Sequence, residues 1–358
     1  MTLLEVDGLH TRFPTPRGTV DAVNEVDLRI ESGEIVGLVG ESGSGKSVLA
    51  ESVMGIVEEP GEIAGGDIRL HGESLLDLPE SERREIRGGT VSMVFQDPMN
   101  SLNPTLTVGE QIAEMVRLHQ PVGESVSLPA EIKRKIVGAA KNGEAWRKAI
   151  EMLESVEIPE PESRATDYPH EFSGGMRQRA MIAMALAAEP DLLIADEPTT
   201  ALDVTIQAQI LDELRDLQDA FDTAILLITH DLAVVAEVCD RVNVMYAGEI
   251  VERAEADALF RDPQHPYTQG LIASTPRLDA PTDELEPIEG NVPDLIDIPY
   301  ACHFAPRCPE AKRECYEVHP DFRPVGDSAR YPNRPRGGES NEDHVAACLR
   351  RGPEEERL

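Results

Sequence analysis

The sequence has no long apolar runs. None of its 358 residues belongs to an apolar run of eighteen or more, which excludes a bilayer-spanning helix. The first residues, MTLLEVDGLHTRF, lack a basic region followed by an apolar stretch, so we expect no secretory signal and a cytosolic protein. Hydrophobic residues still make up 41% of the chain, an ordinary share for a globular protein, and the length favours about two domains.

Positive charge is also scarce. The chain has 33 lysines and arginines against 67 acidic residues, a net charge of −34, and lysine is much rarer than arginine. Such a surface repels nucleic acid and anionic lipid, so we expect no nucleic-acid partner. Because the acid excess is spread over the whole chain, we favour adaptation to high salt, where the Debye length falls to about 3 Å at 1 M. The alternative is simply an acidic, very soluble protein.

Cysteine is rare until the last sixty or so residues. Cys239 has apolar neighbours and is predicted to be a buried core thiol. The other four thiols lie in the tail, and a disulfide framework is disfavoured in a reducing compartment. They are Cys302, Cys308, Cys315 and Cys348. Four thiolates suit Zn²⁺, although these spacings are wider than usual zinc pairs, or a [4Fe–4S] cluster, or they stay unliganded. The tail histidines His303, His319 and His344 are expected to be packing or surface residues.

The pattern of apolar residues predicts an α/β fold. Residues 1–33 alternate as strands joined by a turn at PTPRG, whereas EIVGLVG, DLLIAD and AILLIT are continuous apolar runs typical of buried parallel strands. Helical patterns lie between them, and NVMYAGEIVERA is predicted to form a hairpin. Composition shifts to Pro, Asp and Gly after Phe260, so we place a domain boundary near residue 262. We expect a nucleotide-binding domain over 1–262, with a helical part at about 97–172, and a small loop-rich domain over 263–358.

Two motifs carry phosphate chemistry. GESGSGKS fits the P-loop pattern G-x-x-x-x-G-K-[ST] between a predicted strand and helix. Its predicted ATP-binding residues are Gly40, Glu41, Ser42, Gly43, Ser44, Gly45, Lys46 and Ser47. Lys46 is expected at the β- and γ-phosphates, and the Ser47 hydroxyl at Mg²⁺. In LLIADE, four apolar residues bury a strand whose end presents Asp196, a candidate for Mg²⁺ binding, and Glu197, a candidate general base.

A third motif carries a family resemblance. FSGGMRQR resembles the ABC-transporter signature usually written LSGGQ, and the order of motifs is that of an ABC nucleotide-binding domain. The resemblance implies a RecA-like core with an antiparallel β subdomain and a helical subdomain, and an ATPase that dimerises head to tail. In that dimer Ser173, Gly174, Gly175 and Met176 would contact ATP held by the partner's P-loop. The remaining residues that the resemblance implies are Phe13 for adenine stacking, Gln96 for Mg²⁺ and coupling, Asp203 at the dimer interface and His230 at the γ-phosphate.

The finer resemblance is to the ATP-binding subunits of oligopeptide and dipeptide importers, through QDPMNSLNPTLTVGEQI, HPYTQGLIASTPRL, GNVPDL and CHFAPRC. The SGGM form is similar to the first of two ATPase types in that family. This implies a second ATPase subunit, homologous or identical, two permease subunits, a solute-binding protein, and a location on the cytoplasmic face of the membrane. It also implies that the four tail cysteines bind a [4Fe–4S] cluster. Alternatives are an importer of another solute, such as nickel or a sugar oligomer, a non-transport ABC ATPase, and a redox or metal sensor.

Overall fold

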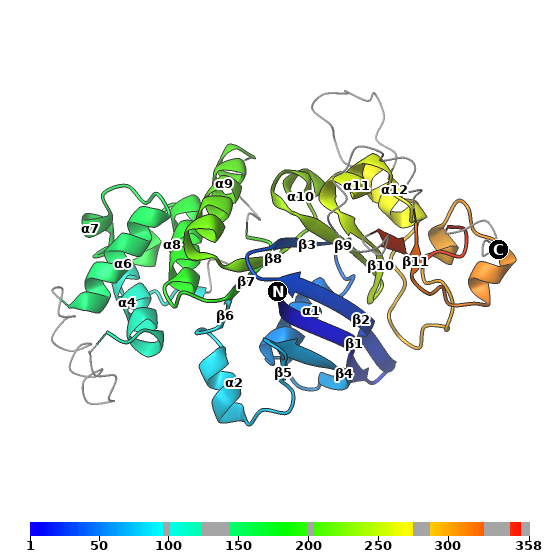
Figure 1. The fold of residues 1–358 in the computed structure, drawn as a ribbon, viewed down its shortest axis with the longest axis horizontal. Coiled ribbons are helices and arrows are strands. Elements are labelled where there is room, and N and C mark those ends of the chain that lie inside the picture. The colour runs from blue at the N-terminus through cyan, green and yellow to red at the C-terminus, as the bar shows by residue number, and fades with distance from the viewer. Residues whose placement is uncertain (96–100, 123–142, 199–203, 275–286, 326–343, 352–358) are drawn as a thin grey trace. The chain divides into compact units, whose positions relative to one another are not determined.

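The computed structural model describes residues 1–95, 101–122, 143–198, 204–274, 287–325 and 344–351 (Figure 1). They group into two compact units. The first consists mainly of residues 77–226, and the second of residues 2–30, 34–76 and 227–358. The predicted boundary near residue 262 lies inside the second unit, and the division at that position stays a prediction.

The first unit combines helices with a short parallel pair of strands (Figure 1). Its elements are α2 Glu80–Ile86, β6 Val91–Val94, α4 Val108–His119, α6 Glu144–Ser155, α7 Pro161–Arg164, η1 Pro169–Glu171, α8 Gly174–Leu186, β7 Leu192–Asp196 and α9 Val204–Phe221. Helices α4, α6 and α8 pack together, and α4 buries Val108, Ile112 and Val116 at the four-residue spacing of one helix face. All five residues of β7 are buried, as its continuous apolar sequence predicts.

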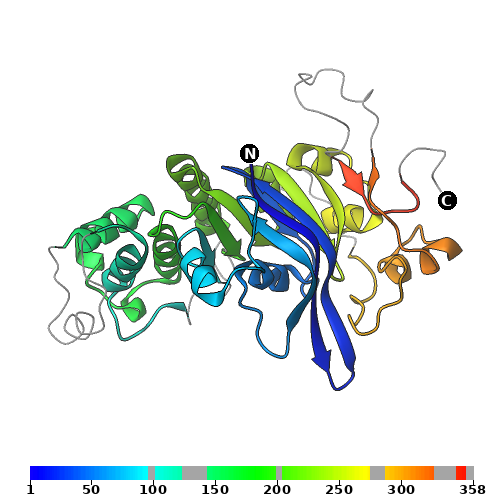
Figure 2. The same ribbon diagram turned by 60° about the horizontal axis from the view of Figure 1, so that its bottom comes forward.

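The second unit contains an antiparallel sheet with strand order β2-β1-β4-β5. Its strands are β1 Thr2–Thr15, β2 Gly18–Glu31, β4 Glu62–Leu70 and β5 Glu73–Ser74. β1 pairs with β4, with Leu4 opposite Leu70 and Val6 opposite Ile68, so that buried side chains alternate with exposed ones. Figure 2 shows the long hairpin formed by β1 and β2. The predicted strands over 1–33 and their turn at PTPRG are confirmed.

A second group of strands in this unit has the order β11-β12-β10-β9-β3. They are β3 Ile35–Val39, β9 Arg241–Tyr246, β10 Glu249–Glu255, β11 Arg323–Pro324 and β12 Val345–Ala346. β3 and β9 are parallel and the other pairs are antiparallel. The helices are α1 Lys46–Met54, α10 Leu232–Val238, α11 Ala256–Arg261, α12 Pro266–Ala273, η2 Ala305–Arg307 and η3 Arg313–Tyr316, and β8 Ala224–Thr229 runs from the first unit into the second.

The predicted hairpin of β9 and β10 is confirmed, and its turn is tight. The two turn residues, Ala247 and Gly248, both have positive φ, of 48° and 86°. Two such residues make the turn whose twist matches that of the flanking strands. The turn also contacts the P-loop, because the Gly248 N–H donates to the Ser44 carbonyl at 2.9 Å.

The tail extends the sheet that this hairpin begins. Strand β12 pairs with β10, with Ala346 opposite Glu252, and β11 pairs with β12. The rest of the described tail is turns and short 3₁₀ helices, and its own apolar cluster is small, with Ala305, Cys315 and Leu349 packed beside Cys302. Within the described residues, no helix is long and apolar enough to cross a membrane.

Candidate functional site

The P-loop, residues 40–47, connects β3 to the first turn of α1. Two of its glycines are required by close backbone contacts. A Cβ at Gly40 would lie 2.1 Å from the Met245 carbonyl oxygen, and a Cβ at Gly45 would lie 2.2 Å from the Ala22 carbonyl oxygen. Gly45 also has φ of 105°, which favours glycine, and it is the N-cap of α1. The loop therefore ends at a helix N-terminus, where backbone N–H groups and the helix dipole favour an anion.

Lys46 is the buried cation of this loop. Its side-chain amine donates to the carbonyl oxygens of Gly40 at 2.9 Å and Glu41 at 3.0 Å, and to the Ser44 hydroxyl at 3.3 Å. These bonds hold the amine against the loop that, by sequence, wraps phosphate oxygens. Ser47 follows in the first turn of α1 and is half-buried.

Asp196 and Glu197 lie in the first unit, at the carboxyl end of β7. Asp196 is the last residue of the strand and is buried, with 4% of its surface exposed. Glu197 is half-buried and has φ of 48°. A left-handed conformation is uncommon for a residue with a long side chain, and such strained residues concentrate at functional sites. The strand therefore presents two carboxylates in succession, as predicted.

The signature motif begins α8 in the first unit. Ser173 is the N-cap of this helix, and its hydroxyl accepts a hydrogen bond from the Met176 N–H at 3.3 Å. Gly174 and Gly175 form the first helical positions, so their N–H groups belong to the free end of the helix. The predicted helix start at the signature is thus present in α8, and its binding of a partner's ATP stays a prediction.

Two of the other predicted nucleotide residues lie within the described part of the chain. His230 follows β8 directly and is exposed. Phe13, on β1, is half-buried with its ring against Gly61, so the adenine-stacking role stays a prediction. Gln96 and Asp203 lie outside the described residues.

The four tail cysteines are gathered by the fold. The thiols of Cys302 and Cys308 each interact electrostatically with those of Cys315 and Cys348, although Cys348 follows β12 and the others precede it by more than thirty residues. Burial raises the pKa of Cys302 to about 12 and that of Cys308 to about 11, and it also raises the pKa of Cys348. Cys239 is separate from this group, buried beside Gly37 as predicted.

An ion pair that the sequence did not predict connects the cysteine segment to the P-loop. The Arg307 guanidinium, between Cys302 and Cys308 in CHFAPRC, donates to both carboxylate oxygens of Glu41 at 2.7 and 3.1 Å. The Arg307 side chain is 5% exposed, and Glu41 holds its pKa above the ordinary value for arginine.

Aromatic rings pack around this contact. The Phe304 ring lies 5.2 Å from that of Tyr246 and 5.4 Å from that of Tyr267, and the Arg307 guanidinium lies over the Tyr246 ring. The Tyr267 hydroxyl accepts a hydrogen bond from the Glu41 N–H at 2.9 Å. The cysteine segment thus contacts the Glu41 side chain through Arg307, and its Phe304 packs against Tyr267 of α12, which contacts the Glu41 backbone. The sequence signal for this ion pair was an arginine within a cysteine motif. The spacing of the motif does not indicate which acidic residue that arginine contacts.

The tail histidines are bound to glutamates of β10. His344 Nε2 contacts Glu252, a fully buried carboxylate that also accepts from the backbone N–H groups of Gln264 and His265. His303 and His319 both contact Glu249. The expectation that these histidines are packing or surface residues missed their acidic partners on β10.

Comparison with known families identifies two regions. The model described as ABC transporter matches residues 23–200, and the model described as oligopeptide/dipeptide transporter, C-terminal region, matches residues 251–315. The first includes the P-loop, the signature and the Asp196–Glu197 pair. The second includes three of the four tail cysteines and Arg307.

Curated relatives match over almost the whole chain. The oligopeptide transport ATP-binding protein AppD of Bacillus subtilis is 49% identical over 322 residues, which cover 90% of this chain and 93% of that protein. OppD of Salmonella typhimurium, also an oligopeptide transport ATP-binding protein, is 48% identical, covering 89% of each. The dipeptide transport ATP-binding protein DppD of Bacillus subtilis is 48% identical, covering 89% of this chain and 90% of that protein.

Solved structures agree with the fold. A dimeric ATP-binding cassette in a post-hydrolysis state, bound to ADP and Pi, matches with a TM-score of 0.60 and 26% identity, covering 71% of this chain and 99% of that one. CbiO1 from Clostridium perfringens, part of an ABC transporter complex, matches with a TM-score of 0.58 and 25% identity, covering 73% and 91%. The expected α/β P-loop fold and ATPase activity are confirmed. The chain belongs to the ABC transporter family, among the ATPases that carry the oligopeptide/dipeptide transporter C-terminal region.

Proposed function

We propose that this chain is the ATP-hydrolysing subunit of an importer for dipeptides or oligopeptides, bound to its permeases at the cytoplasmic face of the membrane. The observation that carries the proposal is the match of both regions, cassette and tail, to proteins named as oligopeptide and dipeptide transport ATP-binding proteins. The chain would act with a second ATPase subunit, two permease subunits and a solute-binding protein.

The P-loop supplies the binding step. Backbone N–H groups of residues 40–47 and the start of α1 would surround the β- and γ-phosphates of ATP, because a helix N-terminus favours anions. The Lys46 amine would exchange its hydrogen bonds to the loop carbonyls for hydrogen bonds to phosphate oxygens. Ser47 and Asp196 would hold Mg²⁺, together with Gln96.

Hydrolysis needs a group that activates water. Glu197 is proposed for this role, because it follows Asp196 at the carboxyl end of a buried strand and its backbone is held in an uncommon conformation. His230 is proposed to contact the γ-phosphate. Ser173 and the N–H groups of Gly174 and Gly175 would complete the site of the partner subunit, with Asp203 at the interface between subunits.

The tail cysteines are proposed to bind a [4Fe–4S] cluster. Four thiols gathered from distant positions, two of them buried and two half-buried, fit the all-cysteine ligand set of such a cluster. A single Zn²⁺, with Zn–S bonds of about 2.3 Å, would need all four sulfurs within roughly 4 Å of one another. When bound, the cluster would join segments of the tail that share only a small apolar cluster.

The test of the catalytic role is Glu197→Gln in the complex reconstituted with its partner subunits. The variant keeps the size of the side chain and removes its basic oxygen, so we expect ATP binding to persist and hydrolysis to fall by about 10²-fold or more. A suitable control is Glu189→Gln. Glu189 also has positive φ, at 54°, but it precedes β7, whereas Glu197 follows it. Unchanged hydrolysis in Glu197→Gln, or equal losses in both variants, would exclude Glu197 as the general base.

A further inference from the structure

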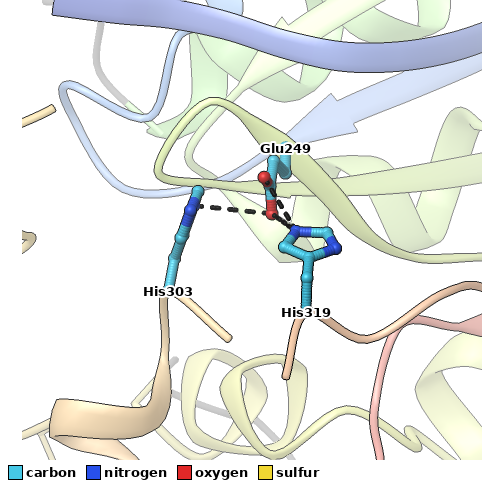
Figure 3. A group of neighbouring side chains, drawn as sticks. All are labelled: Glu249, His303 and His319. Carbon is cyan, nitrogen blue, oxygen red and sulfur yellow. Dashed lines mark hydrogen bonds and ion pairs between the residues drawn. The ribbon is translucent and has the colours of Figure 1, made fainter. Parts of the chain in front are cut away.

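Glu249, His303 and His319 form a compact group of metal-ligand type. Each contributes one donor atom, and these atoms all lie within 4.8 Å of one another. Glu249 begins β10, while His303 and His319 come from tail segments sixteen residues apart. Figure 3 shows the two imidazoles directed at the same carboxylate from different segments. The group is distinct from the cysteines, although His303 follows Cys302 in the chain.

The two distances between histidine and glutamate suit a bound ion. His319 Nε2 lies 3.0 Å from both carboxylate oxygens of Glu249, and His303 Nδ1 lies 3.4 Å from one of them. With metal–donor bonds of about 2.0–2.2 Å, neighbouring ligands of a tetrahedral or octahedral ion lie roughly 3.0–3.5 Å apart. All three side chains are largely buried, with exposed fractions of 13% for Glu249, 6% for His303 and 16% for His319.

Neighbouring groups orient these ligands. The Asn24 side-chain amide donates to Glu249 Oε1 at 2.7 Å, and the Tyr300 ring stacks on that of His319 at 4.8 Å between centroids. Such outer contacts fix the direction of a ligand and are typical of metal centres. The Ala247 carbonyl oxygen lies 3.2 Å from the ligand atom itself, His303 Nδ1. Without metal, imidazole N–H groups would donate to Glu249 and to Ala247, so an ion would replace those protons.

We propose that Glu249, His303 and His319 bind one divalent transition-metal ion, with Zn²⁺ as the natural occupant. Two imidazoles and a carboxylate suit such ions, whereas Mg²⁺ and Ca²⁺ prefer oxygen ligands alone. Water or the Ala247 carbonyl would fill the fourth position.

The ion would join two tail segments to the turn between β9 and β10. That turn donates from Gly248 N–H to the Ser44 carbonyl of the P-loop, so the site would brace the nucleotide-binding loop from the tail.

The experiment titrates the full chain, stripped by a chelator, with Co²⁺ alone. Imidazole and carboxylate ligands give Co²⁺ weak visible d–d bands, whereas thiolates add a strong sulfur-to-cobalt charge-transfer band that would report the cysteines instead. We expect d–d bands that develop with one equivalent and are separate from any charge-transfer band that the cysteines add. Zn²⁺ should abolish them and Mg²⁺ should not. Affinity should fall at least about tenfold in His319→Gln and in Glu249→Gln.

The matched control is His344→Gln, because His344 also contacts a buried β10 glutamate, Glu252, but within the described residues these two side chains belong to no group of three metal-ligand side chains. It should bind Co²⁺ like the original chain. EPR of Cu²⁺ bound to the unaltered protein tests the same ligands without depending on how a variant folds. Two imidazole ligands should produce hyperfine splittings from two nitrogens. Cobalt that binds solely with charge transfer, unchanged binding in His319→Gln, or no nitrogen splitting would overturn the proposal.

Discussion

Replacing Arg307 with methionine tests whether the cysteine segment supports the P-loop. Methionine keeps much of the length and apolar volume of the side chain but removes its charge. The Glu41 carboxylate would lose two charged hydrogen bonds, of 2.7 and 3.1 Å. It would then stand as an uncompensated negative charge in the loop that binds triphosphate. We therefore expect lower stability and severalfold weaker ATP binding.

The magnitude follows from burial. Hydrogen bonds to charged groups contribute about 1.5–3 kcal/mol each, and breaking a fully buried ion pair costs about 3–5 kcal/mol. Arg307 is 5% exposed, but Glu41 is 30% exposed and can regain water, so the loss lies at the lower end of these ranges. A coupling of about 2 kcal/mol between the two side chains is expected, about thirtyfold in an equilibrium constant.

The assay is a double-mutant cycle of Arg307→Met and Glu41→Gln, with urea unfolding and ATP binding as readouts. Glu41→Gln should restore ATP affinity in the Arg307→Met background, because it removes the unpaired charge. The control cycle uses Arg313 and Glu317, an exposed pair at 2.8 Å, for which we expect less than about 1 kcal/mol. Additive effects at Arg307 and Glu41, or no rescue of ATP affinity, would refute the reasoning.

Three further predictions concern pH, salt and metal. Burial lowers the pKa of His265 to about 4, whereas the unfolded histidine binds a proton below about pH 6.5. The free energy of unfolding should therefore decrease as the pH falls from about 6.5 to about 4, by about 3 kcal/mol. An equal dependence on pH in His265→Asn would contradict this. Because the net charge is −34, raising KCl from about 0.1 M to about 1 M should raise the melting temperature through screening, and a constant or lower value would argue against salt adaptation. Protein purified without oxygen should contain about four irons per chain, which Cys348→Ser should lose, whereas one tightly bound zinc in the original chain would contradict the cluster.

Local features of the fold were predictable from the sequence. Strands β3, β7 and β8 are continuous apolar runs, and every residue in each is buried. The P-loop and the start of α8 are contiguous motifs, so their own residues define both the turn and the helix N-terminus. These parts were predictable because the residues that define each of them are contiguous in the sequence.

Contacts between distant segments were not predictable. Arg307 meets Glu41 across 266 positions, and β12 joins β10 through two residues of a Pro- and Gly-rich tail. Neither periodicity nor composition encodes which acid a buried arginine meets. The shared role of Glu249 for His303 and His319 was missed for the same reason, since each histidine alone is typical of packing. A single sequence shows that the tail has residues of metal-ligand type, but it does not place them against the β9–β10 hairpin.

The most direct test of the central claim measures ATP hydrolysis by the complex in proteoliposomes, assembled with the permeases and second ATPase subunit and supplied with the solute-binding protein. Addition of short peptides should stimulate hydrolysis and drive their accumulation inside vesicles oriented for import, and Glu197→Gln should remove both effects. Hydrolysis that peptides leave unchanged while another solute stimulates it would contradict the peptide assignment, and transport that continues without hydrolysis would contradict the proposed role of this chain.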